Sequence, residues 1–169
     1  MKRRIAVLAL VLLAVSLVAT TGSTGSGDSR DVLELDVMAP VSEPFTGAAN
    51  AIRDVAGGGL PWEIDKAKGA LRSDGRLEVE VEGLVLARRA PVPEALRGTN
   101  PVPSFKAIVS CLTTSGGVAT TVNVSTGLVP ASSDGDAEIE ASLVLPSPCF
   151  APIVFVTSPG DMWFAVTGR

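Results

Sequence analysis

The chain of 169 residues contains no histidine. This absence excludes Ser-His-Asp and Cys-His nucleophilic catalysis, and it excludes zinc or copper sites built on imidazole. The G-x-S-x-G motif of serine hydrolases, the phosphate-binding loop and the dinucleotide-binding motif are missing as well. We therefore predict a non-enzymatic protein with no catalytic residue, no cofactor and no metal site.

Positive charge is also scarce and scattered. Residues 22–169 contain 11 Lys and Arg and 18 Asp and Glu, which gives a net charge of −7, and only Arg88 and Arg89 are adjacent. Proteins that bind nucleic acid need clustered basic residues, because these neutralise the phosphate backbone. We therefore expect no nucleic-acid partner, and anionic membranes are disfavoured for the same reason.

The N-terminus has the layout of a secretory signal. Lys2, Arg3 and Arg4 precede an apolar run at 5–19, which small residues follow. This run is shorter than the roughly 20 residues that cross a bilayer as a helix, and no cysteine follows it to carry a lipid. We predict a signal peptide at 1–21, cleaved at an approximate position, and a flexible linker at 22–30. The protein is then secreted and keeps no stable membrane span, whereas an uncleaved anchor is the alternative.

Two cysteines, Cys111 and Cys149, lie in the part that would be exported. An extracellular compartment permits oxidation, and two cysteines allow a single intramolecular pairing. We predict a structural disulfide between them. Reactive thiols or half of a metal site are the alternatives.

Alternating apolar and polar residues predict short β-strands throughout the exported part. Asp74-Gly75 is a strong hairpin signal between strands at 67–72 and 77–82. Ser115-Gly116-Gly117 predicts a second hairpin, and the Pro-rich segment 90–103 is expected to connect two sheets because proline cannot pair in a central strand. Further strands are predicted at 33–37, 105–111, 118–124, 139–145, 153–157 and 162–167.

Seven or eight short strands without a long helix predict an all-β fold for residues 31–169, folded as one domain. We favour an antiparallel β-sandwich of the immunoglobulin-like type, with a partly open β-barrel as the alternative. In antibody domains a tryptophan lies between the two cysteines, but Trp62 and Trp163 both fall outside the interval from Cys111 to Cys149. The strand topology is therefore left open.

Several segments resemble those of uncharacterised secreted β-domain proteins from high-GC bacteria. They lie at 59–62, 71–77, 100–103, 109–112 and 145–149. This resemblance covers most of the exported part, and it implies a bacterial secreted protein without an assigned activity or functional residue. The hairpin at 67–82 with Gly83-Leu84 is also loosely similar to the repeat of chordin-like (CHRD) β domains. Those domains usually carry histidine, which this chain lacks.

Glu78, Glu80 and Glu82 project from one face of a predicted strand at spacings of about 6.5 to 7 Å. Carboxylates at such spacings suit glycosidic acid-base chemistry or a weak cation site, but they also keep an exposed sheet soluble. Trp62 follows Pro61 at a loop end, so it either stacks on a ligand or completes the core. These four residues are the candidate ligand contacts.

The leading hypothesis is a secreted binding or structural module that contacts an extracellular protein or a cell-envelope glycan through loops at one end of the sandwich. The first alternative is a carboxylate-dependent glycan hydrolase that uses Glu78, Glu80 and Glu82. The second is a secreted inhibitor that docks on another enzyme through the loop at 88–100.

Overall fold

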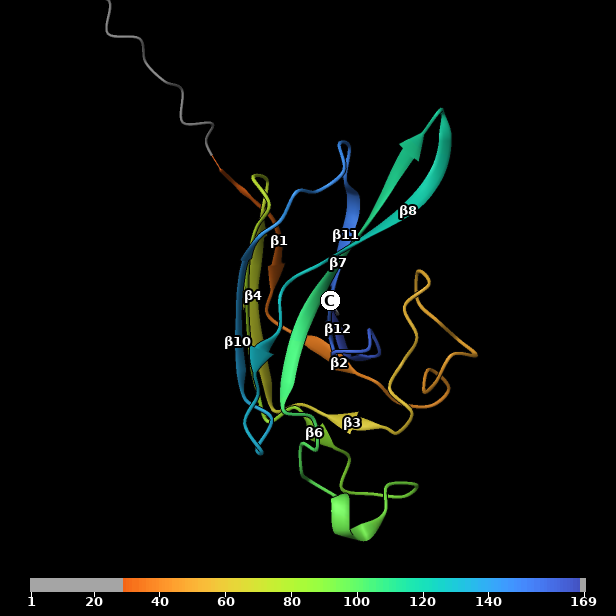
Figure 1. Cartoon of the computed structure of the whole chain (residues 1–169), viewed down its shortest axis with the longest axis vertical. Coiled ribbons are helices and arrows are strands. Elements are labelled where there is room, and N and C mark those ends of the chain that lie inside the picture. The colour runs from red at the N-terminus through yellow and green to blue at the C-terminus, as the bar shows by residue number, and fades with distance from the viewer. Residues whose placement is uncertain (1–28, 168–169) are drawn as a thin grey trace, which may run out of the picture.

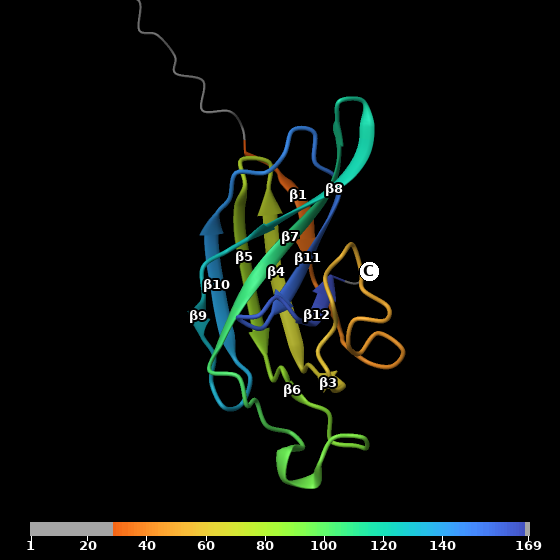
Figure 2. The same ribbon diagram turned by 45° about the vertical axis from the view of Figure 1, so that its right-hand side comes forward.

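The computed structural model describes residues 29–167. The predicted signal peptide and most of the predicted linker lie outside these residues. Figures 1 and 2 show two antiparallel sheets that pack face to face and do not close into a barrel. The predicted all-β sandwich is confirmed. No helix within residues 29–167 is long and apolar enough to cross a membrane.

The first sheet contains Glu78, Glu80 and Glu82. Its strands, in spatial order, are β1 (Asp31–Leu35), β4 (Lys66–Arg72), β5 (Arg76–Glu82) and β10 (Ala137–Ser142). The turn between β4 and β5 forms where Asp74-Gly75 predicted it, and the Arg76 N–H donates to Asp74 Oδ1 at 3.0 Å. Along β5, Leu77, Val79 and Val81 are buried, so the glutamates between them project from the outer face.

The second sheet is almost free of charge. Its main strands, in spatial order, are β2 (Met38–Pro40), β12 (Trp163–Thr167), β11 (Phe150–Thr157), β7 (Ser104–Ser115) and β8 (Val118–Ser125), and β9 (Val129–Pro130) also pairs with β7. Lys106 is the one charged residue in these six strands, whereas the four strands of the first sheet carry seven acidic and four basic residues. Strands that are apolar on both faces are normally covered on both faces.

The first sheet covers one face of the second sheet, and the loop at 41–61, hereafter the covering loop, packs against the other face. The loop follows β2, contacts β12 where Gly58 N–H donates to the Trp163 carbonyl, and reaches β7 and β8 through Arg53. The Arg53 guanidinium donates to the Ser110 carbonyl at 2.9 Å, and the Asn123 side chain donates to the Arg53 carbonyl at 2.9 Å. These contacts hold the Gly-rich segment as an irregular loop without a helix.

The connections between strands are those of an immunoglobulin-like sandwich. The chain forms β4 and β5 in the first sheet, β7 and β8 in the second, β10 in the first, and finally β11 and β12 in the second. The resulting orders β4-β5-β10 and β12-β11-β7-β8 are those of strands A-B-E and G-F-C-C′. The immunoglobulin-like prediction is confirmed, and β1 and β2 add one strand to each sheet.

The Pro-rich segment connects the two sheets, as predicted from its sequence. It runs from β6 (Val85–Leu86), which pairs with β3 (Trp62–Glu63), to the start of β7. A 3₁₀ turn at Glu94–Leu96 lies within it. Arg88 and Arg89 both form ion pairs with Glu63, at 3.2 and 3.3 Å, so the start of the loop at 88–100 is tied to β3.

Cys111 of β7 and Cys149, immediately before β11, form the predicted disulfide, with their Cα atoms 5.0 Å apart. The strands β7 and β11 are neighbours in the second sheet. The bond therefore lies within one sheet, beside the core, and does not join the two sheets as it does in antibody domains. A disulfide of this kind is typical of proteins in oxidising compartments.

Candidate functional site

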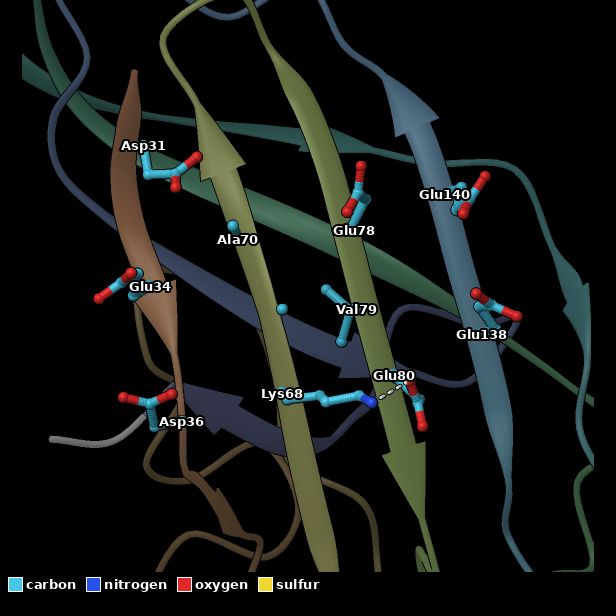
Figure 3. A pocket seen from close by; sticks show the side chains of 11 residues that line it. Asp31, Glu34, Asp36, Lys68, Ala70, Glu78, Val79, Glu80, Glu138 and Glu140 are labelled. Atoms are coloured by element: carbon cyan, nitrogen blue, oxygen red, sulfur yellow. Dashed lines mark ion pairs between the residues drawn. The ribbon is translucent and has the colours of Figure 1, made fainter. Parts of the chain in front are cut away.

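A shallow groove of about 320 Å³ crosses the outer face of the first sheet (Figure 3). Its floor is formed by the side chain of Ala70 and by the backbone at Gly69 and Val79, and Lys68 is the single basic residue that lines it. All other lining residues are acidic and come from three strands and from the segment after β1: Asp31, Glu34, Asp36, Glu78, Glu80, Glu138 and Glu140. We call this feature the acidic groove.

The pairing register of β5 and β10 brings glutamates face to face. Glu140 lies directly opposite Glu78, and Glu138 lies directly opposite Glu80. Residues paired in this way on an antiparallel sheet have Cβ atoms about 4.5–5.5 Å apart, and like charges at that separation destabilise the pair. The sheet therefore holds two carboxylate pairs side by side on its water-exposed face, and Lys68 compensates the charge of one of them, Glu80–Glu138.

The groove is open at its centre because Ala70, which lies between Glu34 of β1 and Glu78 of β5 in the pairing register, carries a single methyl group. Gly69 lies opposite Val79 in the pairing of β4 and β5. A Cβ at Gly69 would collide with the backbone carbonyl of Glu78, so a larger residue would force these strands to shift. The methyl group of Ala70 lets the carboxylates of β1 and β5 share one space across β4.

Lys68 neutralises one member of the cluster. Its Nζ lies 2.9 Å from Glu80 Oε2, and the hydrogen bond from this ammonium is the main cause of a lowered pKa for Glu80. A general acid for glycoside hydrolysis needs the opposite, a carboxyl whose pKa is raised above its ordinary value. Glu80 is thus suited to binding a cation rather than to donating a proton.

The three glutamates predicted as one group are separated by the structure. Glu78 and Glu80 line the acidic groove, but Glu82 does not. Glu82 instead pairs with Lys66, whose Nζ lies 2.7 Å from Glu82 Oε1, because the register of β4 and β5 sets these two residues opposite each other. This hydrogen bond raises the pKa of Lys66 above its ordinary value.

Trp62 is not an exposed ligand contact. Its side chain is 3% exposed, and its ring stacks on Phe164 with centroids 3.9 Å apart and meets Phe105 edge-on. Phe105 and Phe164 belong to the hydrophobic core between the sheets. The alternative in which Trp62 stacks on a ligand is therefore wrong, and the alternative in which it completes the core is correct.

The carboxylates of the acidic groove do not form a metal centre. Within residues 29–167, no three Asp, Glu or Cys side chains are arranged to hold a metal ion. Cations that bind proteins through oxygen need several ligands around one point, but the groove spreads its carboxylates over three strands and the segment after β1. The site is suited to an extended cationic ligand with charges at intervals.

Replacing Glu140 by glutamine should stabilise the domain, because it removes one of the two opposed carboxylate pairs. We expect a gain of about 0.2–1 kcal/mol in the free energy of unfolding at low salt, measured by urea denaturation. The gain should shrink at high salt, where exposed charges are screened. Glu94→Gln, a charge change outside both sheets, is the matched control, and a loss of stability in Glu140→Gln would contradict the assigned repulsion.

No family model, curated protein or solved structure matches this chain. The resemblances to secreted proteins of high-GC bacteria and to chordin-like domains stay predictions. What the protein does must therefore be inferred from its own residues.

Proposed function

We propose that the protein is a secreted, non-enzymatic binding module that holds a positively charged segment of an extracellular protein in the acidic groove. The observation that carries this proposal is the pairing register, which sets Glu140 opposite Glu78 and Glu138 opposite Glu80 on the exposed face of the first sheet. A lysine or arginine side chain placed between two such carboxylates replaces repulsion with charge-assisted hydrogen bonds. Binding of the partner therefore relieves a charge repulsion that is present in the free protein.

Secretion is supported by two independent features. The disulfide between Cys111 and Cys149 belongs to an oxidising compartment, and the apolar N-terminus has the layout of a signal peptide. Outside the cell, a net negative charge and the acidic outer face of the first sheet steer basic partners toward the acidic groove. A cell-envelope glycan without amino groups offers no charge of this sign.

Binding is favoured over glycan hydrolysis by the state of the carboxylates. Glu80 is held ionised by Lys68, which lies opposite it on β4. A hydrolase of this class needs one carboxyl to remain protonated until it donates its proton to the leaving group. The ion pair with Lys68 opposes that requirement at one of the four central carboxylates.

The test uses a fluorescent decalysine peptide as the probe and the exported protein as the receptor, with binding followed by fluorescence anisotropy. We expect saturable binding that weakens as salt is added, because exposed charges are screened. The variant with Glu78, Glu80, Glu138 and Glu140 all changed to glutamine should bind at least about tenfold more weakly, which corresponds to 1.4 kcal/mol.

The matched control changes four carboxylates outside the acidic groove to amides, namely Glu43, Asp54, Glu94 and Asp134. It alters the net charge equally, so comparable weakening in both variants would show that the groove has no special role. Turnover of a glycan that the first variant loses and the control retains would replace the binding module with the hydrolase.

A further inference from the structure

The outer edge of β8 is an open end of the second sheet. β8 spans eight residues, pairs with β7 along its whole length without a register shift, and pairs with no other strand in residues 29–167. Its sequence contains no charged residue and no proline. Natural edge strands normally carry a lysine, a proline, a bulge or a very short length, each of which discourages pairing with another chain.

The other sheet edges have the protection that β8 lacks. In the first sheet, β1 carries Asp31, Glu34 and a register shift, and β10 carries Glu138 and Glu140. In the second sheet, the opposite edge β2 is three residues long and ends at Pro40. Within the described sandwich, β8 is thus the one edge strand whose free backbone N–H and C=O groups are not protected against pairing with another chain.

The hairpin turn determines which backbone groups of β8 face outward. Gly116 and Gly117 both have positive φ, 58° and 81°, as a two-residue type I′ turn requires, and Ser115 pairs with Val118 across it. In such a hairpin the pair that closes the turn shares both hydrogen bonds, and bonded and non-bonded pairs then alternate. The N–H and C=O groups of Ala119, Thr121, Asn123 and Ser125 therefore point away from β7.

The face beside this edge is apolar and exposed. Phe150, Leu112 and Thr121 lie in one row across β11, β7 and β8 by the pairing register. Phe150 is 59% exposed and Leu112 is 40% exposed, and Val118 at the hairpin tip is 68% exposed. Figures 1 and 2 show that this hairpin projects beyond the rest of the sandwich, so a partner strand can approach it freely.

The charge distribution indicates what occupies this edge. Residues 107–133, which include all of β8, contain no charged side chain, whereas residues 22–169 carry a net charge of −7. Two copies of such an acidic chain repel each other at most orientations, but they meet at β8 without opposed charges. A basic partner, in contrast, is attracted elsewhere, to the acidic groove.

We propose that two copies of the protein pair through β8 in antiparallel orientation, forming one continuous sheet across a two-fold axis. Each copy contributes the outward groups of Ala119, Thr121, Asn123 and Ser125, and the apolar rows of the two copies become neighbours. Assembly stops at two copies, because the pairing consumes both open edges and the remaining edges are protected.

The first test measures molar mass by light scattering during size exclusion, on exported protein at loading concentrations from about 1 µM to about 500 µM, a range that covers weak and firm homodimers. We expect the mass to rise to twice that of one chain. Thr121→Lys places two lysines in neighbouring positions across the two-fold axis, where they repel each other, and should keep the mass at that of one chain. Ser133→Lys adds the same charge outside β8 and should leave the dimer intact.

The second test follows amide hydrogen exchange by mass spectrometry or NMR at low and high concentration. The N–H groups of Ala119, Thr121 and Asn123 should exchange quickly in the dilute protein and become protected on concentration, whereas those of Thr120 and Val122 are protected throughout. A single-chain mass at every concentration, a dimer unaffected by Thr121→Lys, or a dimer with unchanged exchange at these amides would overturn the proposal. So would an extended peptide of another protein occupying β8 of a monomer.

Discussion

Trp62→Ala should cost about 3–5 kcal/mol in the free energy of unfolding, the range for removing a large buried aromatic side chain. Trp62 is nearly inaccessible to water and stacks on Phe164, while Phe105 meets both rings edge-on. Alanine leaves a cavity at the centre of this cluster, and the two phenylalanines cannot fill it without leaving their rotamers. Since most domains have a total stability of only 5–15 kcal/mol, a large part of that stability is lost.

Urea denaturation followed by circular dichroism measures this effect, since the variant loses one of the two tryptophan fluorophores. Trp62→Phe is the matched control, because it keeps an aromatic ring beside Phe164 and should cost clearly less. An unchanged unfolding midpoint for Trp62→Ala would mean that the side chain is not part of the core.

Removing the disulfide should destabilise the domain by about 4 kcal/mol on the chain-entropy model. The bond between Cys111 and Cys149 closes a loop with a sequence separation of 38 residues. Without the bond, the unfolded chain can adopt conformations that the bond forbids, and its higher entropy favours unfolding. Alanine at both positions is the appropriate change, because Cys111 is fully buried and serine would place an unpaired hydroxyl there.

Denaturation of the wild type with and without a thiol reductant checks this expectation. The reductant should lower the unfolding midpoint of the wild type and leave the double alanine variant unchanged. An unfolding midpoint of the wild type that does not change on reduction would mean that the disulfide does not stabilise the domain by restricting the conformations of the unfolded chain.

The hairpins could be predicted because their signals are local. Asp74-Gly75 and Gly116-Gly117 lie within a few residues of the strands they join, and the periodicity of those strands is visible in the sequence. The disulfide was equally accessible, because two cysteines allow one pairing. The assignment of β10 to the first sheet was not accessible, because no local signal specifies which strand is its neighbour.

That missing information explains the error in the candidate site. Glu138 and Glu140 alternate with apolar residues in the sequence, but only the pairing of β10 with β5 sets them opposite Glu80 and Glu78. Glu82 was grouped with its neighbours on β5, and only the register of β4 shows that Lys66 neutralises it. Charge clusters on a sheet are a property of register, which sequence periodicity leaves undetermined.

The covering loop shows a different limit. Its Gly-rich sequence has no period, so it indicated neither a strand nor a packed role. Its conformation depends on contacts with strands that follow it by dozens of residues, such as Arg53 with Ser110 and Gly58 with Trp163. Irregular segments that are held by long-range contacts carry little signal in their own composition.

The uneven division of charge between the two sheets gives the protein a dipole moment. Eleven charged residues, with a surplus of acidic ones, lie in the strands of the first sheet, and a lysine is the single charge in those of the second. An external field, such as that of a charged cell envelope or a basic protein, therefore exerts a torque on the molecule during approach. The acidic side turns toward positive charge before contact, so productive collisions are selected by orientation as well as by affinity.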